Sequence, residues 1–110
     1  MRIPPDARID DRKLLDYLLK RLPHDDKSAF LARAGFDRKN PGALKEAIRL
    51  LCQSAQATRG QNTPYGAKWL VSGTMTGPNG RVLKVKLVWI EHEDGTFHFV
   101  TLVPRVRGSV

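Results

Sequence analysis

The chain has 110 residues, of which 41% are hydrophobic and 27% charged, and its 19 lysines and arginines against 11 aspartates and glutamates give a net charge of +8 at neutral pH. This length and composition predict one globular domain over residues 1–110, with room for a single modest core. No apolar run approaches the roughly 20 residues that cross a bilayer, and the one cysteine, Cys52, excludes an internal disulfide and a cysteine-rich zinc site.

Three helices are predicted in the first part of the chain, about residues 10–60. An aspartate at 10–11 can cap the first helix, Pro23 stops it, and the leucines between recur at helical spacing. An aspartate at 25–26 can cap a short second helix, which Gly35 ends. The apolar residues of these two helices are Leu14, Leu15, Leu18, Leu19, Leu22, Ala29, Phe30, Leu31 and Ala34.

The third predicted helix is the longest. Asn40 supplies a cap and Pro41 fits the first helical position. Its apolar stripe continues to Ala55, and the helix frays over residues 58–60. Cys52 lies near the stripe and is predicted to be a buried thiol, because no neighbour in sequence would activate it.

The apolar period changes from 3.6 to 2 in the second part, about residues 64–104, which predicts an antiparallel meander. Gly77-Pro78-Asn79-Gly80 and His92-Glu93-Asp94-Gly95 are turn signals, Pro104 ends the last strand, and residues 105–110 form a tail. The predicted strands cover residues 68–76, 81–90 and 96–103. The fold class is therefore α+β, with about three N-terminal helices on one face of a three- to four-stranded antiparallel sheet.

The residues predicted to be buried are Leu15, Leu18, Phe30, Leu44, Ile48, Leu51, Val85, Leu87 and Trp89. Truncating Ile48 or Leu87 to alanine is expected to cost about 2–5 kcal/mol.

Alternation along the strands predicts which side chains share a face, provided that the first hairpin loop has an even number of residues. One face then packs on the helices through Leu70, Leu83, Val85, Leu87 and Trp89. The other carries Trp69, Val71, Lys84, Lys86, Val88, Phe97, Phe99 and Thr101. Aromatic rings among lysines suit base stacking and phosphate neutralisation. Alternatively the lysines are merely solvated and the aromatics form a second small core or a homodimer contact; a three-residue turn would change the parity.

The positive charge favours a polyanionic partner, either nucleic acid or an acidic protein. Residues 1–6 lack the apolar stretch of a signal peptide, which predicts a cytoplasmic chain with no membrane partner, unless another route carries it. The candidate nucleic-acid-binding residues are Trp69, Arg81, Lys84, Lys86 and Arg107.

No motif for a phosphate loop, a dinucleotide or a serine nucleophile is present, and no histidine pair has metal-ligand spacing, so no metal or other cofactor is expected. His24 and His92 are interpreted as surface or turn residues, and His98 as a partly buried strand residue on the face of Val100 and Leu102. An enzyme built from such dispersed residues fits metal-independent RNA cleavage, because the 2′-hydroxyl of the substrate is itself the nucleophile.

Several stretches together resemble a family of small bacterial domains. They are Lys13–Leu19, Lys27–Phe30 with Gly35-Phe36, Tyr65–Trp69, Gly77–Gly80, Val88–Ile90 and Val100–Pro104, which lie within about residues 3–104. Members of that family occur alone beside a small partner gene, or at the C-termini of polymorphic toxins and phage minor head proteins. The resemblance implies a toxic enzyme with an immunity partner. The order of elements is also similar to the fold of barnase, colicin and ribosome-dependent RNase toxins, by analogy.

The chain departs from the family pattern at two places. Pro23–Asp26 stands where the family has a glycine-rich linker before the lysine that matches Lys27. Residues 97–100 replace a Pro-Arg-Leu sequence before Thr101, so His98 or Arg105 would substitute for the missing arginine.

The predicted function is a metal-independent endoribonuclease toxin, neutralised by a small acidic antitoxin or immunity protein. Lys68 and Arg105 would stabilise phosphate charge, and His98 or Tyr65 would transfer the proton. The full set of catalytic candidates is Lys27, Tyr65, Lys68, His98, Thr101 and Arg105. The alternatives are a non-enzymatic module that binds nucleic acid or protein, and a phage-related structural or interaction domain.

Overall fold

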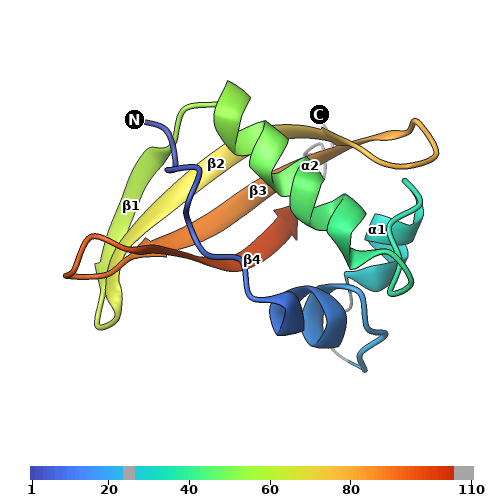
Figure 1. Ribbon diagram of the computed structural model, residues 1–110, viewed down its shortest axis with the longest axis horizontal. Helices are drawn as coiled ribbons and strands as arrows, with labels where there is room; N and C mark the ends of the chain where they lie inside the picture. Colours follow the sequence, from blue (N-terminus) through green and yellow to red (C-terminus); the bar gives the residue numbers. More distant parts are fainter. Residues whose placement is uncertain (24–26, 106–110) are drawn as a thin grey trace.

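The structure is a computed structural model that describes residues 1–23 and 27–105 (Figure 1). Within these two ranges, three helices precede four strands, and the strands form one antiparallel sheet in the order β1-β2-β3-β4. The elements are the π-helix η1 (Lys13–Leu18), α1 (Ser28–Ala32), α2 (Pro41–Ser54), β1 (Thr58–Thr63), β2 (Gly66–Thr76), β3 (Val82–Glu91) and β4 (Phe97–Pro104). The described helices are all too short or too polar to span a membrane.

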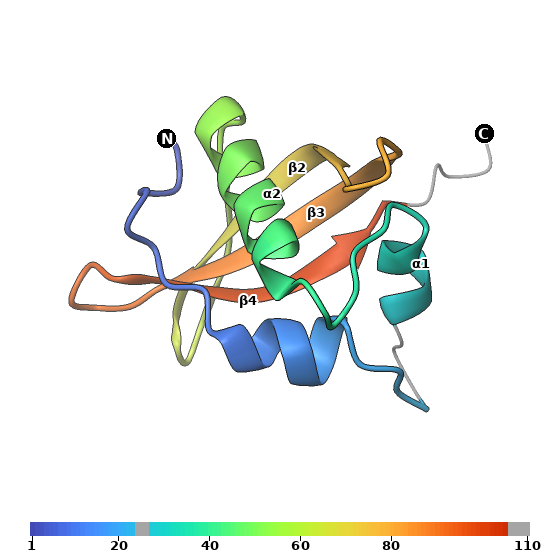
Figure 2. The same cartoon turned by 45° about the vertical axis from the view of Figure 1, so that its right-hand side comes forward.

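Helix α2 lies across one face of the sheet (Figures 1 and 2). Gly73 of β2 permits this close packing, because a Cβ added there would lie 2.5 Å from Leu51 Cδ1 of α2. Helix α1 lies instead beside the β2–β3 turn. Asn79 of that turn donates hydrogen bonds to the residues that follow α1, from Nδ2 to Arg33 O at 2.9 Å and from its backbone N–H to Ala34 O at 3.2 Å. The helices therefore take different positions around the sheet, and α2 makes the main layer.

The first helix is shorter and wider than its sequence pattern predicts. Residues 11–12 are already helical ahead of η1, and Asp10 Oδ1 accepts the N–H of Arg12 at 2.9 Å, as expected of an aspartate that caps this helix. Leu19 then donates its N–H to Leu14 O at 2.8 Å, which is the hydrogen bond between residues i and i+5 that defines a π-helix. The wider turn buries Leu14, Leu18 and Leu19, whereas Leu15, which was expected in the core, is only partly buried.

Phe30, also expected in the core, packs against it while partly exposed. Gly35 follows α1 with a φ of +90°, as its predicted role as a helix terminator requires. The expected cap at residues 25–26 and His24 lie outside the described residues.

The end of the predicted third helix is instead a strand. Helix α2 stops at Ser54, and Thr58–Thr63 form β1, which pairs with β2 through Thr58↔Leu70 and Asn62↔Ala67. The sheet therefore begins at Thr58, inside the range assigned to the helical part. The polar sequence of β1 has no period-2 alternation, so its strand conformation comes from pairing with β2.

The register of the first hairpin reverses the predicted faces. Thr76 pairs with Val82, so the loop between them holds five residues, an odd number. Trp69 consequently lies opposite Trp89, and Val71 opposite Leu87, on the core face. Phe97 and Phe99 lie there too, with Phe99 opposite Trp89, and both are buried. The prediction that Trp69, Val71, Phe97 and Phe99 share a face with the lysines, and Leu70 with the core, is therefore wrong.

A β-bulge in β4 changes the alternation a second time. Val88 pairs with Thr101 and Trp89 with Phe99, so Val100 is an extra residue. His98, opposite Ile90, and Thr101, opposite Val88, therefore lie on the same face of the sheet. The expected grouping of His98 with Leu102 is wrong, since Leu102 lies opposite Leu87 and is fully buried.

The face of the sheet opposite α2, called the second face below, carries most of the polar side chains of the sheet. Its members on β2, β3 and β4 include Lys68, Leu70, Ser72, Thr74, Thr76, Val82, Lys84, Lys86, Val88, Ile90, His98, Thr101 and Val103.

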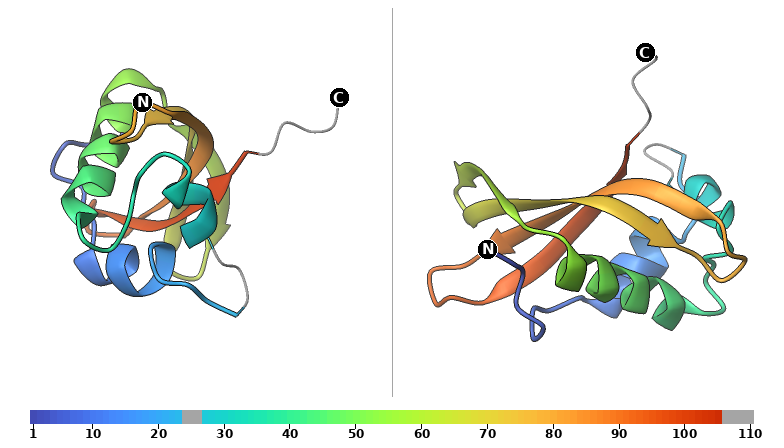
Figure 3. Two further views of the ribbon diagram at one scale, coloured as in Figure 1. Left: turned by 90° about the vertical axis from the view of Figure 1, so that its right-hand side faces the viewer. Right: turned by 90° about the horizontal axis from the view of Figure 1, so that it is seen from above.

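The N-terminal segment runs beside β4 and covers its edge (Figure 3). Arg8 makes a parallel bridge with His98: Arg8 N donates to Phe97 O at 2.8 Å, and Phe99 N donates to Arg8 O at 2.8 Å. Arg49 of α2 fixes the same segment through its Nη1, which donates to Pro5 O at 3.0 Å and Ala7 O at 3.1 Å. Ala7 is buried and Arg8 is exposed.

The Cys52 thiol is expected to be inert in the folded protein. Cys52 is 5% exposed, and burial raises the pKa of its thiol from 9.0 to about 12. Only the thiolate reacts with disulfide reagents, so labelling near neutral pH should require unfolding. The raised pKa also means that stability is unaffected below pH 9.0 and falls as pH rises toward about 12. The measurement is the labelling rate in buffer against that in denaturing urea; equal rates would contradict the burial.

Candidate functional site

The catalytic candidates from the sequence fall into separate groups in the structure. Tyr65, Lys68 and His98 line one groove at the end of the sheet where β2 begins and β4 begins. Lys27 and Thr101 contact each other farther along β4. Arg105 lies at the far end of β4, seven residues from His98, which is roughly 23 Å along a strand.

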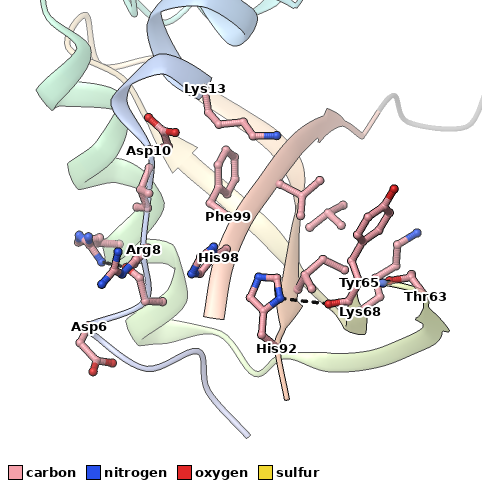
Figure 4. A pocket seen from close by; sticks show the side chains of 16 residues that line it. Asp6, Arg8, Asp10, Lys13, Thr63, Tyr65, Lys68, His92, His98 and Phe99 are labelled. Carbon is pink, nitrogen blue, oxygen red and sulfur yellow. Dashed lines mark hydrogen bonds between the residues drawn. The ribbon is translucent and has the colours of Figure 1, made fainter. Parts of the chain in front are cut away.

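The groove has a volume of about 860 Å³ and lies between the N-terminal segment and the second face (Figure 4). Its floor is apolar, because Val88 and Ile90 are 7% and 8% exposed. Its walls carry ionisable groups from four distant parts of the chain. Among them are Arg8 and Lys13 of the N-terminal part, Tyr65 and Lys68 of the β1–β2 hairpin, His92 after β3, and His98 of β4.

A row of paired residues crosses the second face at the groove. Lys68 of β2 lies opposite Ile90 of β3, Ile90 lies opposite His98 of β4, and His98 forms the bridge with Arg8. Neighbouring strands lie about 4.8 Å apart, so the row places a cation on each side of the His98 imidazole. The stem of Lys68 passes over Gly60, where an added Cβ would lie 3.2 Å from Lys68 Cδ.

His92 and His98 form a close pair. Their ring centroids are 4.5 Å apart and the rings are nearly perpendicular, at 75°. His92 Nδ1 lies 3.1 Å from the carbonyl oxygen of Tyr65. A carbonyl only accepts hydrogen bonds, so Nδ1 carries the hydrogen and Nε2 is the nitrogen left for other chemistry. His92 is thus half-buried in the site, rather than the exposed turn residue that the sequence suggested.

The turn after His92 is held by Asp94. Asp94 Oδ1 accepts hydrogen bonds from the Thr96 hydroxyl at 2.7 Å and from the Thr96 N–H at 3.0 Å. These bonds, the hydroxyl's first, lower the pKa of Asp94 below its usual value, and attraction to His92 and His98 lowers it further. An ionised carboxylate therefore stands near the histidine pair.

Lys27 contacts Thr101 of the second face and forms a second polar site there. Its Nζ donates hydrogen bonds to Thr101 Oγ1 at 2.9 Å and to Tyr17 OH at 3.2 Å, and lies 5.0 Å from the centroid of the Tyr17 ring. The structure thus joins Lys27 and Thr101, which are 74 residues apart.

The remaining candidates lie outside both sites. Lys84 and Lys86 are on the second face near Arg105, whose N–H donates to Lys84 O at 2.9 Å. Arg81 is exposed in the β2–β3 loop. Arg107 lies outside the described residues. Trp69 is on the core face, where its Nε1 donates to Glu91 Oε1 at 3.0 Å. The Arg59 guanidinium lies 5.8 Å from the centroid of its ring. Because Trp69 is on the core face, it does not share a surface with Lys84 and Lys86.

The sequence interpretation missed Arg8 and His92. Arg8 reaches the groove through a parallel pairing of two segments ninety residues apart, which leaves no local pattern. His92 could have been placed there from the correct hairpin register, since it continues the even-numbered series of Val88 and Ile90. Within residues 1–23 and 27–105, no three or more histidine, cysteine, aspartate or glutamate side chains come together in a way that could hold a metal ion.

The chain belongs to the family described as Domain of unknown function (DUF6883), whose model matches residues 5–106. A search of curated proteins finds no match to the chain. Among solved structures, a chain of the contact-dependent growth inhibition toxin–immunity protein complex from Klebsiella pneumoniae 342 is similar in fold, with a TM-score of 0.68 and 22% identity. The match covers 88% of the present chain and 98% of that chain.

Proposed function

We propose that the chain is a toxin domain that cleaves RNA at the groove, using the histidine pair as acid and base. The observation that carries this proposal is the 4.5 Å pairing of His92 with His98, in a row that ends on Lys68 and Arg8. The net charge of +8 favours a polyanionic substrate. The similarity in fold to a chain of a toxin–immunity complex supports the toxin role.

The groove supplies each group that transfer of an RNA phosphate to its own 2′-oxygen requires. His92, whose Nδ1–H faces the Tyr65 carbonyl, takes the 2′-hydroxyl proton at Nε2. The 2′-oxygen then attacks phosphorus as the bond from phosphorus to the 5′-oxygen breaks. Protonated His98 donates its proton to that leaving oxygen. The products are a 2′,3′-cyclic phosphate and a 5′-hydroxyl end. The two histidines account for both proton transfers, so the reaction is complete without a metal ion.

Lys68 and Arg8 would stabilise the charge that builds on the phosphate oxygens during the reaction. Their places at the two ends of the row allow both to face one phosphate seated at His98. The apolar floor of Val88 and Ile90 lowers the local dielectric and strengthens these attractions.

The inhibitory partner in this proposal is a small acidic immunity-type protein that covers the groove and the second face. Lys68, Lys84 and Lys86 all point from this face, so an acidic surface would meet them together. Such a partner would block access of RNA and the chemistry at once.

The test is inducible expression of the full chain in a bacterial host. Wild type should arrest growth and leave RNA fragments with cyclic phosphate ends, whereas His98→Ala and Lys68→Ala should relieve the arrest. Lys39→Ala, at an exposed position in the α1–α2 loop, is the matched control and should arrest growth like wild type. Growth unaffected by wild type would refute the toxin. Purified protein that binds RNA without cleaving it would replace the enzyme with a binding module.

A further inference from the structure

We infer that Lys27, Tyr17 and Thr101 form a second phosphate-binding subsite, which takes a neighbouring phosphate of the strand cleaved at the histidine pair. The substrate class is then a single-stranded polynucleotide that extends along β4, rather than a dinucleotide. This inference rests on the proposed function for the direction of the strand, but the subsite itself has its own geometry.

The hydrogen bonds of Lys27 leave its ammonium group able to bind an anion. An ammonium carries three donors, and two of them are directed at neutral oxygens, Thr101 Oγ1 at 2.9 Å and Tyr17 OH at 3.2 Å. None of the acidic side chains in the described ranges lies within 4.0 Å of Lys27 Nζ. Neither hydroxyl partner of this half-buried ammonium group carries a negative charge, so neither offsets its attraction for an anion.

The subsite is continuous with the groove. Thr101 and Tyr17 line a neighbouring hollow of about 420 Å³, and this hollow shares Asp10, Lys13 and Val100 with the groove. The bulge at Val100 turns His98 and Thr101 to the same face, about 10 Å apart along the strand. One phosphate cannot occupy both positions, whereas a strand that passes over Val100 reaches both.

The acidic residues of the hollow already have partners. Asp16 Oδ1 lies 3.7 Å from Arg38 Nη2, and Asp10 Oδ1 accepts the Arg12 N–H at 2.9 Å. Lys13 lines both cavities and so supplies a cation where they meet; Figure 4 shows it at the edge of the groove. The path from His98 to Lys27 is therefore suited to a phosphate backbone.

The experiment measures binding of a 2′-O-methyl RNA pentamer, which lacks the nucleophile, and of the matching dinucleotide across a salt series. Lys27→Met should bind the pentamer about tenfold more weakly at low salt. The slope of log affinity against log salt should fall by about 0.7, the value for one lost phosphate contact on a single strand. Dinucleotide binding should not change. Lys39→Met, an exposed lysine outside both cavities, is the control and should leave both affinities unchanged.

Lys27→Gln is the second variant, because it retains hydrogen bonding to Thr101 and Tyr17 without the charge, and it decides the matter if Lys27→Met fails to fold. An unchanged salt slope in the folded variant overturns the subsite, whether or not the protein cleaves RNA. Absence of cleavage together with the reduced slope refutes the nuclease and retains the subsite. With cleavable RNA, the subsite predicts a raised KM and an unchanged kcat; a lowered kcat would place Lys27 in the chemistry and overturn the separate role.

Discussion

Replacing His98 by alanine is expected to lower kcat for RNA cleavage by about 100- to 10,000-fold, the usual contribution of a positioned acid or base. His98 would protonate the leaving 5′-oxygen, and alanine leaves that oxygen to depart as an alkoxide. His92→Ala should lower kcat by a similar factor. The factor by which kcat falls in the double variant should be much smaller than the product of the two single factors, because the two histidines act together. The measurement is kcat on a single-stranded oligonucleotide, with the end groups of the products identified.

The leaving group of the substrate distinguishes this role from a structural one. A substrate whose leaving oxygen departs without a proton, such as a p-nitrophenyl ester of a nucleoside 3′-phosphate, makes the acid unnecessary. His98→Ala should therefore cleave this substrate nearly as fast as wild type, whereas His92→Ala should remain slow. Thr74→Ala, an exposed position on the second face away from the groove, is the control and should cleave both substrates like wild type. Full activity of folded His98→Ala on RNA would exclude the histidine mechanism.

Local sequence signals were sufficient for most of the elements. The apolar stripe after Asn40-Pro41 correctly predicts α2, and period-2 alternation correctly predicts β2, β3 and β4 within a few residues. These patterns are informative because the spacing of apolar residues along a short segment largely determines whether it forms a helix or a strand. Strand β1 lacks such a pattern, because Thr58–Thr63 are polar and are ordered by pairing with β2 alone.

The arrangement of the candidate site required information that the local signals do not carry. Gly77-Pro78-Asn79-Gly80 marks a turn, but whether Arg81 belongs to the loop decides the register, and one residue moves every side chain to the other face. Because Arg81 does belong to the loop, Trp69 lies on the core face. The bulge at Val100 changes the alternation of β4, so that Thr101 lies on the same face as His98. Arg8 came from a parallel pairing with β4, which no periodicity predicts.

The groove depends on a core that can be tested separately on α2. Leu44→Ala and Ile48→Ala are each expected to lower the free energy of unfolding by about 2–5 kcal/mol, because both side chains are fully buried and truncation leaves a cavity. Leu50→Ala removes the same atoms as Leu44→Ala from the same helix. Leu50 is 56% exposed, so its truncation should change the free energy by less than about 0.5 kcal/mol.

Urea unfolding at equilibrium provides the measurement, through the shift in the midpoint at a constant m-value. Equal shifts for Leu44→Ala and Leu50→Ala would contradict the packing of α2 on the sheet. The core variants also separate stability from chemistry. Where they remain folded, they should retain the kcat of wild type, since α2 contributes neither histidine of the pair and neither Lys68 nor Arg8. A buried variant that lost kcat while folded would show instead that α2 positions the groove, through the bonds of Arg49 to the segment carrying Arg8.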